Sequence, residues 1–259
     1  MDLGLAGRKA IVCASSRGLG KACARALAEA GCEVVINGRD AKTLAATAAE
    51  LSQLTGAKVI AVAADVATAD GQMALLTACP QPDILINNNA GPPLRDFREL
   101  SRQQMIDGLT ANMIVAVELI QKVIDPMLQR RFGRIVNITS GAVKAPLAGL
   151  DLSSGARAGL TAFLAGVART VADKNVTINN ILPGAFDTDR LRGTLSKAAE
   201  TRGKSIAQVA ADRINSIPAK RFGNPAEFGA ACAFLCSTHA GYITGQNLLI
   251  DGGSFPGAF

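Results

Sequence analysis

The 259-residue sequence contains no tryptophan, one histidine and one tyrosine, and aromatic residues make up only 4% of it. A nucleic-acid interface needs aromatic side chains among clustered basic ones, and this sequence has no block of five or six basic residues. We therefore predict no nucleic-acid partner, although 27 Lys+Arg against 21 Asp+Glu give a net charge of +6. The scarcity of His and Tyr also leaves few of the usual proton donors for catalysis.

Long apolar runs are missing as well. No charge-free apolar stretch reaches the roughly 18 to 20 residues that span a bilayer, and the stretch after Arg8 and Lys9 is too short for the core of a signal peptide. The six cysteines lie in apolar segments without the spacing of metal ligands, so we expect buried, reduced thiols and no metal site. These absences predict a cytoplasmic protein with no membrane partner.

Apolar residues, in contrast, are plentiful. The sequence is 49% hydrophobic and only 19% charged, which is too apolar for a disordered chain. A chain of this length buries a full core and lies near the upper limit for one domain. We therefore expect a single domain over residues 1–259.

Short β-branched runs alternate with longer helical patterns along the chain. Such alternation is typical of βαβ units, and short apolar strands are typical of a parallel sheet covered on both faces. The fold class is therefore predicted to be α/β, a doubly wound Rossmann-type sandwich around a seven-stranded parallel sheet. The predicted strands are 9–14, 33–37, 58–63, 84–88, 134–139, 177–182 and 247–250. The predicted helices are 19–30, 41–54, 70–78, 101–131, 154–173 and 225–237.

Two segments stand out from this alternation. In the helix predicted over 101–131, apolar residues recur every three or four positions and form a wide stripe that must cover the sheet or a partner subunit. Residues 189–221 are longer and more charged than the other connections, with a helical pattern near 206–214. Because this segment follows a strand late in the chain, it is a candidate substrate lid, and a plain pair of surface helices is the alternative.

A glycine-rich turn follows the first predicted strand and leads directly into a helix. Glycines there let the backbone approach a pyrophosphate, and the helix N-terminus supplies unpaired N–H groups and the positive end of its dipole. Because strand, turn and helix occur in this order at the first strand, we predict a dinucleotide site. Its predicted contacts in this turn are Ser15, Arg17, Gly18, Leu19 and Gly20.

The end of the second strand indicates which dinucleotide is bound. An acidic residue there would bind the adenosine ribose 2′-OH, but the sequence has Arg39, and Arg17 lies in the first turn. Two guanidinium groups suit a 2′-phosphate, since their planar forks pair with phosphate oxygens. The predicted cofactor is therefore NADP(H). The alternative is that Arg39 only begins a helix next to Asp40.

Together these motifs resemble the short-chain dehydrogenase/reductase family across essentially the whole chain. The resemblance implies an adenine-contacting pair at Asp65 and Val66, a helix asparagine at Asn112 and a catalytic serine at Ser140. It also implies a loop on the nicotinamide side of the cofactor, with contacts from Pro183, Gly184, Phe186 and Thr188.

Two turns depart from the pattern of that family. Ala14 stands where the family has its first turn glycine, which puts a methyl group into a tight turn and is expected to weaken cofactor binding. Residues 87–91 read Asn-Asn-Asn-Ala-Gly against the family's Asn-Asn-Ala-Gly. Either Asn88 and Asn89 match its two asparagines with one inserted residue, or Asn87 and Asn88 match them without a gap, and both alignments stay open. The cofactor contacts predicted here are Asn88, Asn89 and Ala90.

The largest departure is a missing tyrosine. In the family a Tyr and, one helical turn later, a Lys follow the catalytic Ser and share one helix face. Those positions hold Ser153 and Arg157 here, and the only tyrosine, Tyr242, lies in the closing motif. Ser is a much poorer acid than Tyr, and Arg stays charged, so this pair cannot run the family's proton relay in the same way.

Hydride transfer is still expected without that relay. Ser140 keeps a hydrogen-bond donor for the substrate oxygen, and Arg157 can bind ribose hydroxyls and polarise a carbonyl. Acid–base catalysis contributes typically about 10²- to 10⁴-fold, and orientation contributes a separate share. The proton would then come from water, Lys144 or Asp151. The predicted catalytic residues are Asn112, Ser140, Ser153 and Arg157, and Arg157 is also predicted to contact the cofactor.

The sequence therefore predicts an NADP(H)-dependent oxidoreductase that resembles the 3-oxoacyl carrier protein reductases and acts on a small-molecule carbonyl or an acyl thioester. The alternative is a catalytically retired relative that binds nucleotide as a partner or regulatory subunit, because the acid–base pair is replaced while the cofactor loops are kept. Nothing argues positively for dehydration or isomerisation. The apolar stripe of residues 101–131 and the apolar C-terminal segment predict a homodimer or homotetramer.

Overall fold

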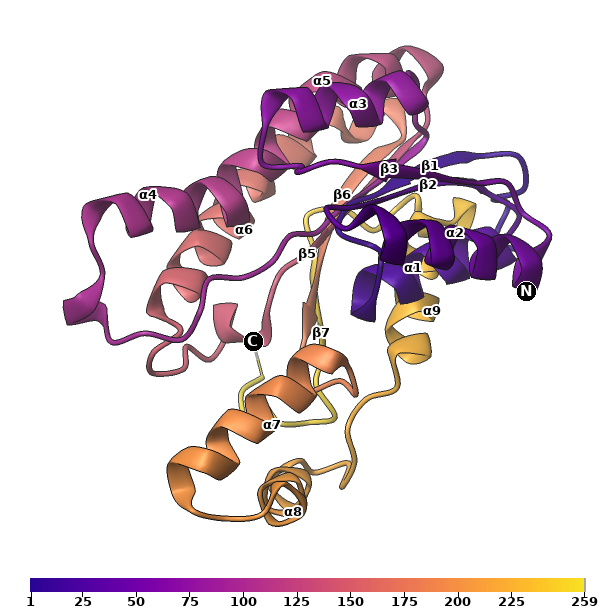
Figure 1. Cartoon of the computed structure of the whole chain (residues 1–259). Coiled ribbons are helices and arrows are strands. Elements are labelled where there is room, and N and C mark those ends of the chain that lie inside the picture. The colour runs from indigo at the N-terminus through magenta and orange to yellow at the C-terminus, as the bar shows by residue number, and fades with distance from the viewer. Residues whose placement is uncertain (259) are drawn as a thin grey trace.

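A seven-stranded parallel sheet forms the centre of the computed structural model, which describes residues 1–258 (Figure 1). The strand order is β3-β2-β1-β4-β5-β6-β7. The strands are β1 (Lys9–Val12), β2 (Glu33–Gly38), β3 (Val59–Ala63), β4 (Ile84–Asn87), β5 (Gly133–Ile138), β6 (Val176–Pro183) and β7 (Asn247–Ile250). The predicted fold class and the seven predicted strands are confirmed.

Helices cover both faces of this sheet (Figure 1). One apolar cluster joins Leu27 and Phe228 to one face, and a second joins Leu119 and Leu160 to the other. The sheet therefore lies between two hydrophobic layers, as its nearly continuous apolar strands require. The helices are α1 (Gly18–Glu29), α2 (Ala41–Thr55), α3 (Ala69–Ala78), α4 (Arg102–Leu109), α5 (Val115–Arg130), α6 (Asp151–Val171), α7 (Asp189–Arg202), α8 (Ile206–Ser216) and α9 (Pro225–Cys236).

The chain reverses its direction of winding between β1 and β4. Strands β2 and β3 are added on one side of β1, and β4 to β7 on the other. In doubly wound sheets, ligands bind in the crevice outside the carboxyl ends of the strands at such a switch point. The segments that leave β1 and β4 there are the glycine-rich turn and residues 88–91.

The helix predicted over 101–131 is interrupted. A π-helical turn, Thr110–Ile114, separates α4 from α5. Inside it the Asn112 amide donates to the Gly108 carbonyl at 3.1 Å, so a side chain competes for a backbone acceptor. The predicted helix is confirmed over Arg102–Arg130, but the π-helical turn within it was not predicted, because an apolar stripe does not reveal one turn of different winding.

Helices α7 and α8 occupy the segment singled out as a candidate lid. They pack on each other through a small cluster of their own, formed by Leu195, Ala199 and Val209. This cluster is separate from the two that cover the sheet. The pair lies below the sheet in Figure 1, beyond the carboxyl end of β6. Its first helix begins next to the glycine-rich turn, because a Cβ on Gly18 would lie 3.8 Å from the Thr188 methyl group.

A row of asparagines crosses four strands on one face of the sheet. The amide of Asn87 donates to the Oδ1 of Asn137 at 2.9 Å, Asn137 donates to Asn180 at 3.0 Å, and Asn180 donates to Asn247 at 2.8 Å. These residues are direct register partners in β4, β5, β6 and β7. Each amide N–H group that points along the row therefore finds an acceptor on the neighbouring strand, which ties the register of all four strands together.

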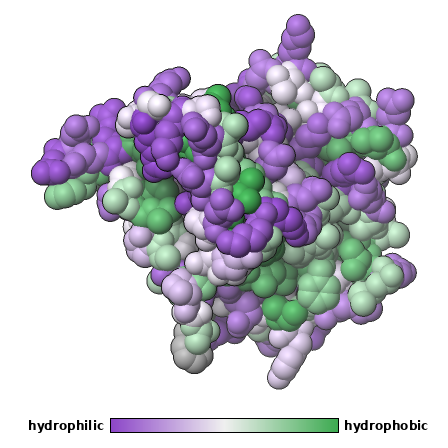
Figure 2. Space-filling model, turned by 90° about the horizontal axis from the view of Figure 1, so that it is seen from below, coloured by the Kyte–Doolittle hydropathy of each residue, from purple (hydrophilic) through white to green (hydrophobic). Residues whose placement is uncertain are grey.

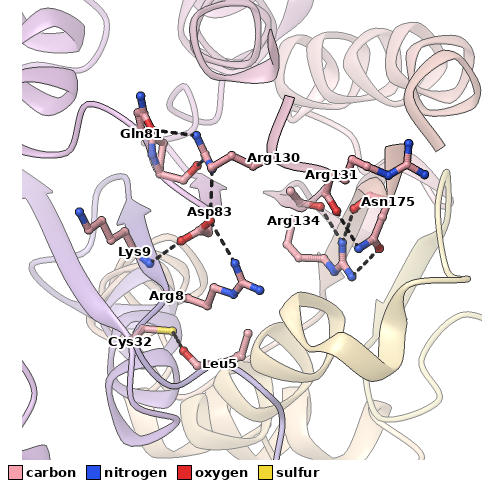
Figure 3. Close-up of polar contacts among 12 residues, drawn as sticks. Leu5, Arg8, Lys9, Cys32, Gln81, Asp83, Arg130, Arg131, Arg134 and Asn175 are labelled. Carbon is pink, nitrogen blue, oxygen red and sulfur yellow. Dashed lines mark hydrogen bonds and ion pairs between the residues drawn. The ribbon is translucent and has the colours of Figure 1, made fainter. Parts of the chain in front are cut away.

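Arginines make polar contacts at the end of the sheet where the strands begin (Figure 3). Asp83 pairs with Arg8 at 3.4 Å and with Arg130 at 3.7 Å. Arg134 is fully buried and donates to the carbonyls of Ser237, Gly133 and Asn175 and to the Asn175 side chain. Arg8, Arg130 and Arg134 therefore serve to hold this end of the sheet together.

The cysteine prediction is confirmed: all six are free and buried. Across residues 1–258, every helix is too short or too polar to cross a membrane.

Candidate active site

The glycine-rich turn is strained at its first residue. Ala14 has a φ of 44°, in the left-handed region that favours glycine. Gly20 has no room for a side chain, because a Cβ there would lie 2.4 Å from the Ala14 carbonyl oxygen. The buried Ser15 hydroxyl fixes the turn by donating to the Val12 carbonyl at 2.6 Å and accepting from the Asn37 N–H at 3.0 Å. The chain thus passes very close to the start of α1.

The N-terminus of α1 is open to an anion. Arg17 stands at the capping position and makes no side-chain capping hydrogen bond, so the N–H groups of the first turn stay free for a ligand. Gly18 has a φ of 59°, and a Cβ on it would lie 3.8 Å from the Thr188 methyl group. The starts of α1 and α7 therefore face each other across a narrow space, and Leu19, just inside α1, packs against the core.

The loop predicted on the nicotinamide side leads from β6 to α7. Gly184 lies too close to Asp251 for a side chain, because a Cβ on Gly184 would lie 2.6 Å from the Asp251 Cβ. Thr188 caps α7 by accepting from the Leu191 N–H at 3.4 Å. Phe186 is buried and packs edge-on against Phe228, with 5.3 Å between ring centroids. Its side chain therefore belongs to the core, whereas Gly184 is exposed and Pro183 and Thr188 are half-buried.

Arg39, directly after β2, and Arg17, in the glycine-rich turn, are both exposed. Neither side chain makes a hydrogen bond or ion pair within residues 1–258, so both are available to an anion. Asp40 caps α2 by accepting from the Thr43 N–H at 2.6 Å. That hydrogen bond, and to a smaller extent the charge of Arg17, lowers the pKa of Asp40. Asp40 is therefore the residue that caps α2, and Arg39 lies next to it without a side-chain contact of its own.

After β3, Val66 is buried and Asp65 is exposed. The Asp65 carboxylate accepts from the Ala67 N–H at 2.9 Å. This contact holds the carboxylate at the surface of the turn that follows β3.

The three asparagines at the end of β4, Asn87, Asn88 and Asn89, make three different contacts. Asn87 lies within the sheet and begins the asparagine row. The Asn88 amide donates to the Ala14 carbonyl at 3.1 Å, and the Asn89 amide donates to the Ala111 carbonyl at 3.2 Å. Asn88 thus ties this loop to the glycine-rich turn and Asn89 ties it to the π-helical turn, while Ala90 is exposed. The structure brings these predicted contacts together at the switch point.

Ser153 and Arg157 lie side by side, buried, on one face of α6. The Arg157 Nε donates to the Ser153 Oγ at 3.3 Å, and its Nη1 donates to the Ile138 carbonyl at 2.8 Å. The guanidinium is therefore held against the end of β5, two residues before Ser140. Ser140 is half-buried there, and its Oγ accepts from the Ala142 N–H at 3.1 Å.

Burial, and to a smaller extent the charge of Arg190, lower the pKa of Arg157 from 12.5 to about 10. Desolvation disfavours the charged form, and a like charge nearby acts in the same direction. At neutral pH the guanidinium nevertheless remains a cation. The position that carries the family's lysine thus holds a fixed positive charge.

A small polar cavity joins these residues. It measures about 20 Å³, enough for one water molecule. The buried Oδ1 atoms of Asn87 and Asn112, both without a partner in the described chain, belong to residues that line it. Other lining residues are Asn88, Asn89, Asn137 and Arg157. Predicted site residues from three separate segments, Asn88 and Asn89, Asn112, and Arg157, therefore meet at one point.

The two other proton sources considered from the sequence make local contacts. The Lys144 amine lies 5.7 Å from the centre of the Phe255 ring. The Asp151 carboxylate accepts from the Gly149 N–H at 3.2 Å at the start of α6.

Sequence reasoning missed two residues of this site. Asn137 lines the cavity from within β5, and only the sheet register places it next to Asn87. Arg190 lies at the start of α7, and its charge reaches Arg157. The sequence places Arg190 two residues after Thr188, just beyond the loop already assigned to the site, but does not show which way its side chain lies.

Comparison with known proteins bears on this arrangement. A family model described as enoyl-(acyl carrier protein) reductase matches residues 13–254. The NADPH-dependent reductase BacG of Bacillus subtilis is 31% identical over 256 residues, which cover 95% of this chain and 97% of that protein. The 3-oxoacyl-[acyl-carrier-protein] reductase FabG of Vibrio cholerae is 32% identical over 257 residues, covering 98% and 99%.

Solved structures share the fold over almost the whole chain. The L-sorbose reductase of Gluconobacter frateurii, solved with NADPH and L-sorbose, superposes with a TM-score of 0.94 at 28% identity, covering 99% of this chain and 100% of that one. YwfH, an NADPH-dependent reductase involved in bacilysin biosynthesis, gives a TM-score of 0.91 at 29% identity, covering 97% and 100%.

Proposed function

The chain belongs to the short-chain dehydrogenase/reductase family, and from this premise we propose that it is an NADP(H)-dependent oxidoreductase that transfers hydride between nicotinamide and a carbonyl/alcohol pair. The observation that carries the proposal is the uncapped start of α1 behind the glycine-rich turn, opposite Thr188. Such a start suits a pyrophosphate, and the relatives named above are NADPH-dependent reductases or 3-oxoacyl carrier protein reductases.

The residues present fit this cofactor. A Cβ on Gly20 would fill the cradle of the turn, and the exposed guanidinium groups of Arg17 and Arg39 suit a 2′-phosphate. Asp65 and Val66 are the proposed adenine contacts, and Asn88, Asn89 and Ala90 lie between the two halves of the site. On the nicotinamide side the proposal uses Pro183, Gly184, Thr188 and the backbone at Phe186.

Bound NADPH supplies the hydride, and the chain's own residues supply orientation and charge. We assign the Ser140 hydroxyl as hydrogen-bond donor to the substrate oxygen. The positive charge of Arg157, held near the end of β5 by Ile138 and Ser153, stabilises negative charge that develops on that oxygen. Solvent water is the proposed proton source, since neither serine has the acidity of a phenol.

The alternative, a catalytically retired nucleotide-binding subunit, rests on the same replacement of Tyr and Lys. The named relatives are reductases, and the match covers nearly their full length, which favours an enzyme over a retired subunit. The deciding measurement is NADPH oxidation by purified protein with a panel of ketones, 3-oxoacyl thioesters and imines. We expect oxidation above the substrate-free rate, and Ser140→Ala lowers it about 10²-fold. Tight NADPH binding with no turnover of any compound favours the retired subunit.

The domain organisation and assembly are part of the proposal. Residues 1–259 are taken as one domain, with the α7–α8 pair as a substrate lid because it packs through its own cluster beside the site. Exposed apolar residues of α4, the π-helical turn and α6 (Met105, Ile106, Leu109, Ile114 and Phe163) supply surface for a homodimer or homotetramer. Apolar side chains also gather on part of the face nearest α7 and α8 (Figure 2). The six free, buried thiols support a cytoplasmic location.

A further inference from the structure

Two guanidinium groups from different helices meet next to Gly91. A Cβ on Gly91 would lie 2.9 Å from the Arg190 Nη2 and 3.5 Å from the Arg157 Nη2. Arg157 comes from inside α6 and is buried, whereas Arg190 comes from the start of α7 and is exposed. The two cations therefore border one point, which glycine leaves open.

Neither cation has an acidic partner. The hydrogen bonds of Arg157 go to a carbonyl and a hydroxyl, and no ion pair among residues 1–258 includes Arg157 or Arg190. The nearest carboxylates in the sequence, Asp187 and Asp189, both pair with Arg192. A buried cation without a counter-ion is costly, and a second cation beside it adds to the cost. An anion between them would relieve both.

A second cavity begins at the same place. It measures about 300 Å³, is lined by Ala90 and Pro92 on either side of Gly91, and extends to Leu100 and Leu152. It shares Asn112 with the polar cavity that Arg157 lines. Its volume is at the lower end for ligand pockets. Its walls are largely apolar, with the charged side chains of Arg95 and Asp107 among the lining residues. Arg157 and Arg190 do not line this cavity but border its end at Gly91, so an apolar body in the cavity could place an anionic group beside them.

We propose that Arg157 and Arg190 bind a carboxylate of the substrate, so that this enzyme acts on small oxo acids or hydroxy acids rather than on neutral carbonyl compounds. This assignment rests on the proposed function, because it places the carboxylate beside the carbonyl that Ser140 contacts. The planar forks of the two side chains suit the two carboxylate oxygens. A cofactor phosphate is the other source of an anion, but the open start of α1 opposite Thr188 already offers it a site.

The test measures binding, so that it does not depend on turnover. The NADP⁺-loaded protein is titrated by calorimetry with acetoacetate, benzoylformate and their amides. We expect the acids to bind at least about tenfold more tightly than the amides. Arg190→Gln, a change at an exposed residue, should weaken acid binding about 10- to 100-fold and leave amide binding unchanged, because a charge-assisted contact is lost. The control is Lys197→Gln, which removes an equal charge from an exposed position of the same helix and should change nothing.

Three outcomes overturn the assignment. One is equal binding of acids and amides, and another is no binding of either acid at millimolar concentration. The third is a tenfold or greater loss of NADPH affinity in Arg190→Gln with the acid preference unchanged, which assigns the pair to a cofactor phosphate. The parent function is tested separately: if acids bind but no NADPH is oxidised, the proposed oxidoreductase fails and the carboxylate site stands. If neutral ketones are reduced as well as acids, the proposed oxidoreductase stands and the carboxylate site fails.

Discussion

The Arg157 Nε donates a hydrogen bond to the Ser153 Oγ at 3.3 Å, between two buried residues one turn apart on α6. The helix thus presents two side chains at the spacing that the family uses for Tyr and Lys, and the pair is coupled without an ionisable phenol. Whatever chemistry this site performs has to use a fixed positive charge in place of a tunable acid.

Restoring the family residues tests whether this charge is used. We expect Ser153→Tyr with Arg157→Lys to lower kcat/KM on the substrate of the parent protein by about tenfold or more, because a lysine cannot replace the bidentate guanidinium. Steady-state kinetics on both proteins check this, with the single Arg157→Lys variant as control. A double variant that gains activity on ketones ignored by the parent would instead indicate a retired scaffold.

Ala14 offers a test of backbone strain in the cofactor turn. Replacing it by glycine removes the cost of a left-handed φ of 44°, and we expect about 0.5 to 1 kcal/mol of added stability together with tighter NADPH binding. Urea unfolding and fluorescence titration measure the two effects. The control is Ala45→Gly, at an exposed position inside α2, which should destabilise by about 1 kcal/mol. Equal losses in the two variants contradict the strain at Ala14.

Arg39 tests the choice of dinucleotide. We expect Arg39→Asp to weaken NADPH binding about 10- to 100-fold while NADH binding changes little or improves, because a carboxylate repels the 2′-phosphate and accepts from a 2′-OH. Fluorescence titration with both nucleotides measures the ratio, and Arg25→Gln, on an exposed part of α1 away from this end, is the control. An unchanged preference for NADPH removes Arg39 from the cofactor site.

The buried Cys13 thiol predicts a fall in stability at alkaline pH. Burial raises the pKa of Cys13 from 9.0 to about 12, so the thiol stays protonated in the fold at a pH where the unfolded chain ionises. Its stabilising contribution is complete below about pH 9 and is lost as the pH rises towards 12, at up to about 1.4 kcal/mol for each pH unit. Urea unfolding at about pH 8 and about pH 11 should show a smaller loss in Cys13→Ala than in the parent. The same loss in both excludes this thiol as the cause.

Arg134 provides a stability test far from the chemistry. It donates to four acceptors at the beginning of β5, and its guanidinium carbon lies 4.4 Å from the centre of the Phe132 ring. We expect Arg134→Lys to lower the free energy of unfolding by about 2 to 4 kcal/mol, because an ammonium reaches fewer of these acceptors and stacks less well. The affinity for NADPH should stay unchanged. Arg98→Lys, at an exposed pair with Asp96, is the matched control.

The sheet could be predicted because it depends on local patterns, and short apolar runs identified each strand. Helical spacing likewise predicted that Ser153 and Arg157 lie on one face of α6. The π-helical turn at Asn112 left no trace, since one differently wound turn hardly alters an apolar stripe. Arg190 was missed because only the packing of α7 over Gly91 shows which way an exposed arginine lies.

The asparagine row has an electrical consequence. The amides of Asn87, Asn137 and Asn180 each donate towards β7, so these three side-chain dipoles are aligned and polarise one another. The oxygen end of this aligned series is the Asn87 Oδ1, which belongs to the cavity that Arg157 also lines. The row therefore places partial negative charge near the Arg157 guanidinium, which has no carboxylate partner. A substitution at Asn247, three strands away, should thus change the electrostatic potential at Arg157.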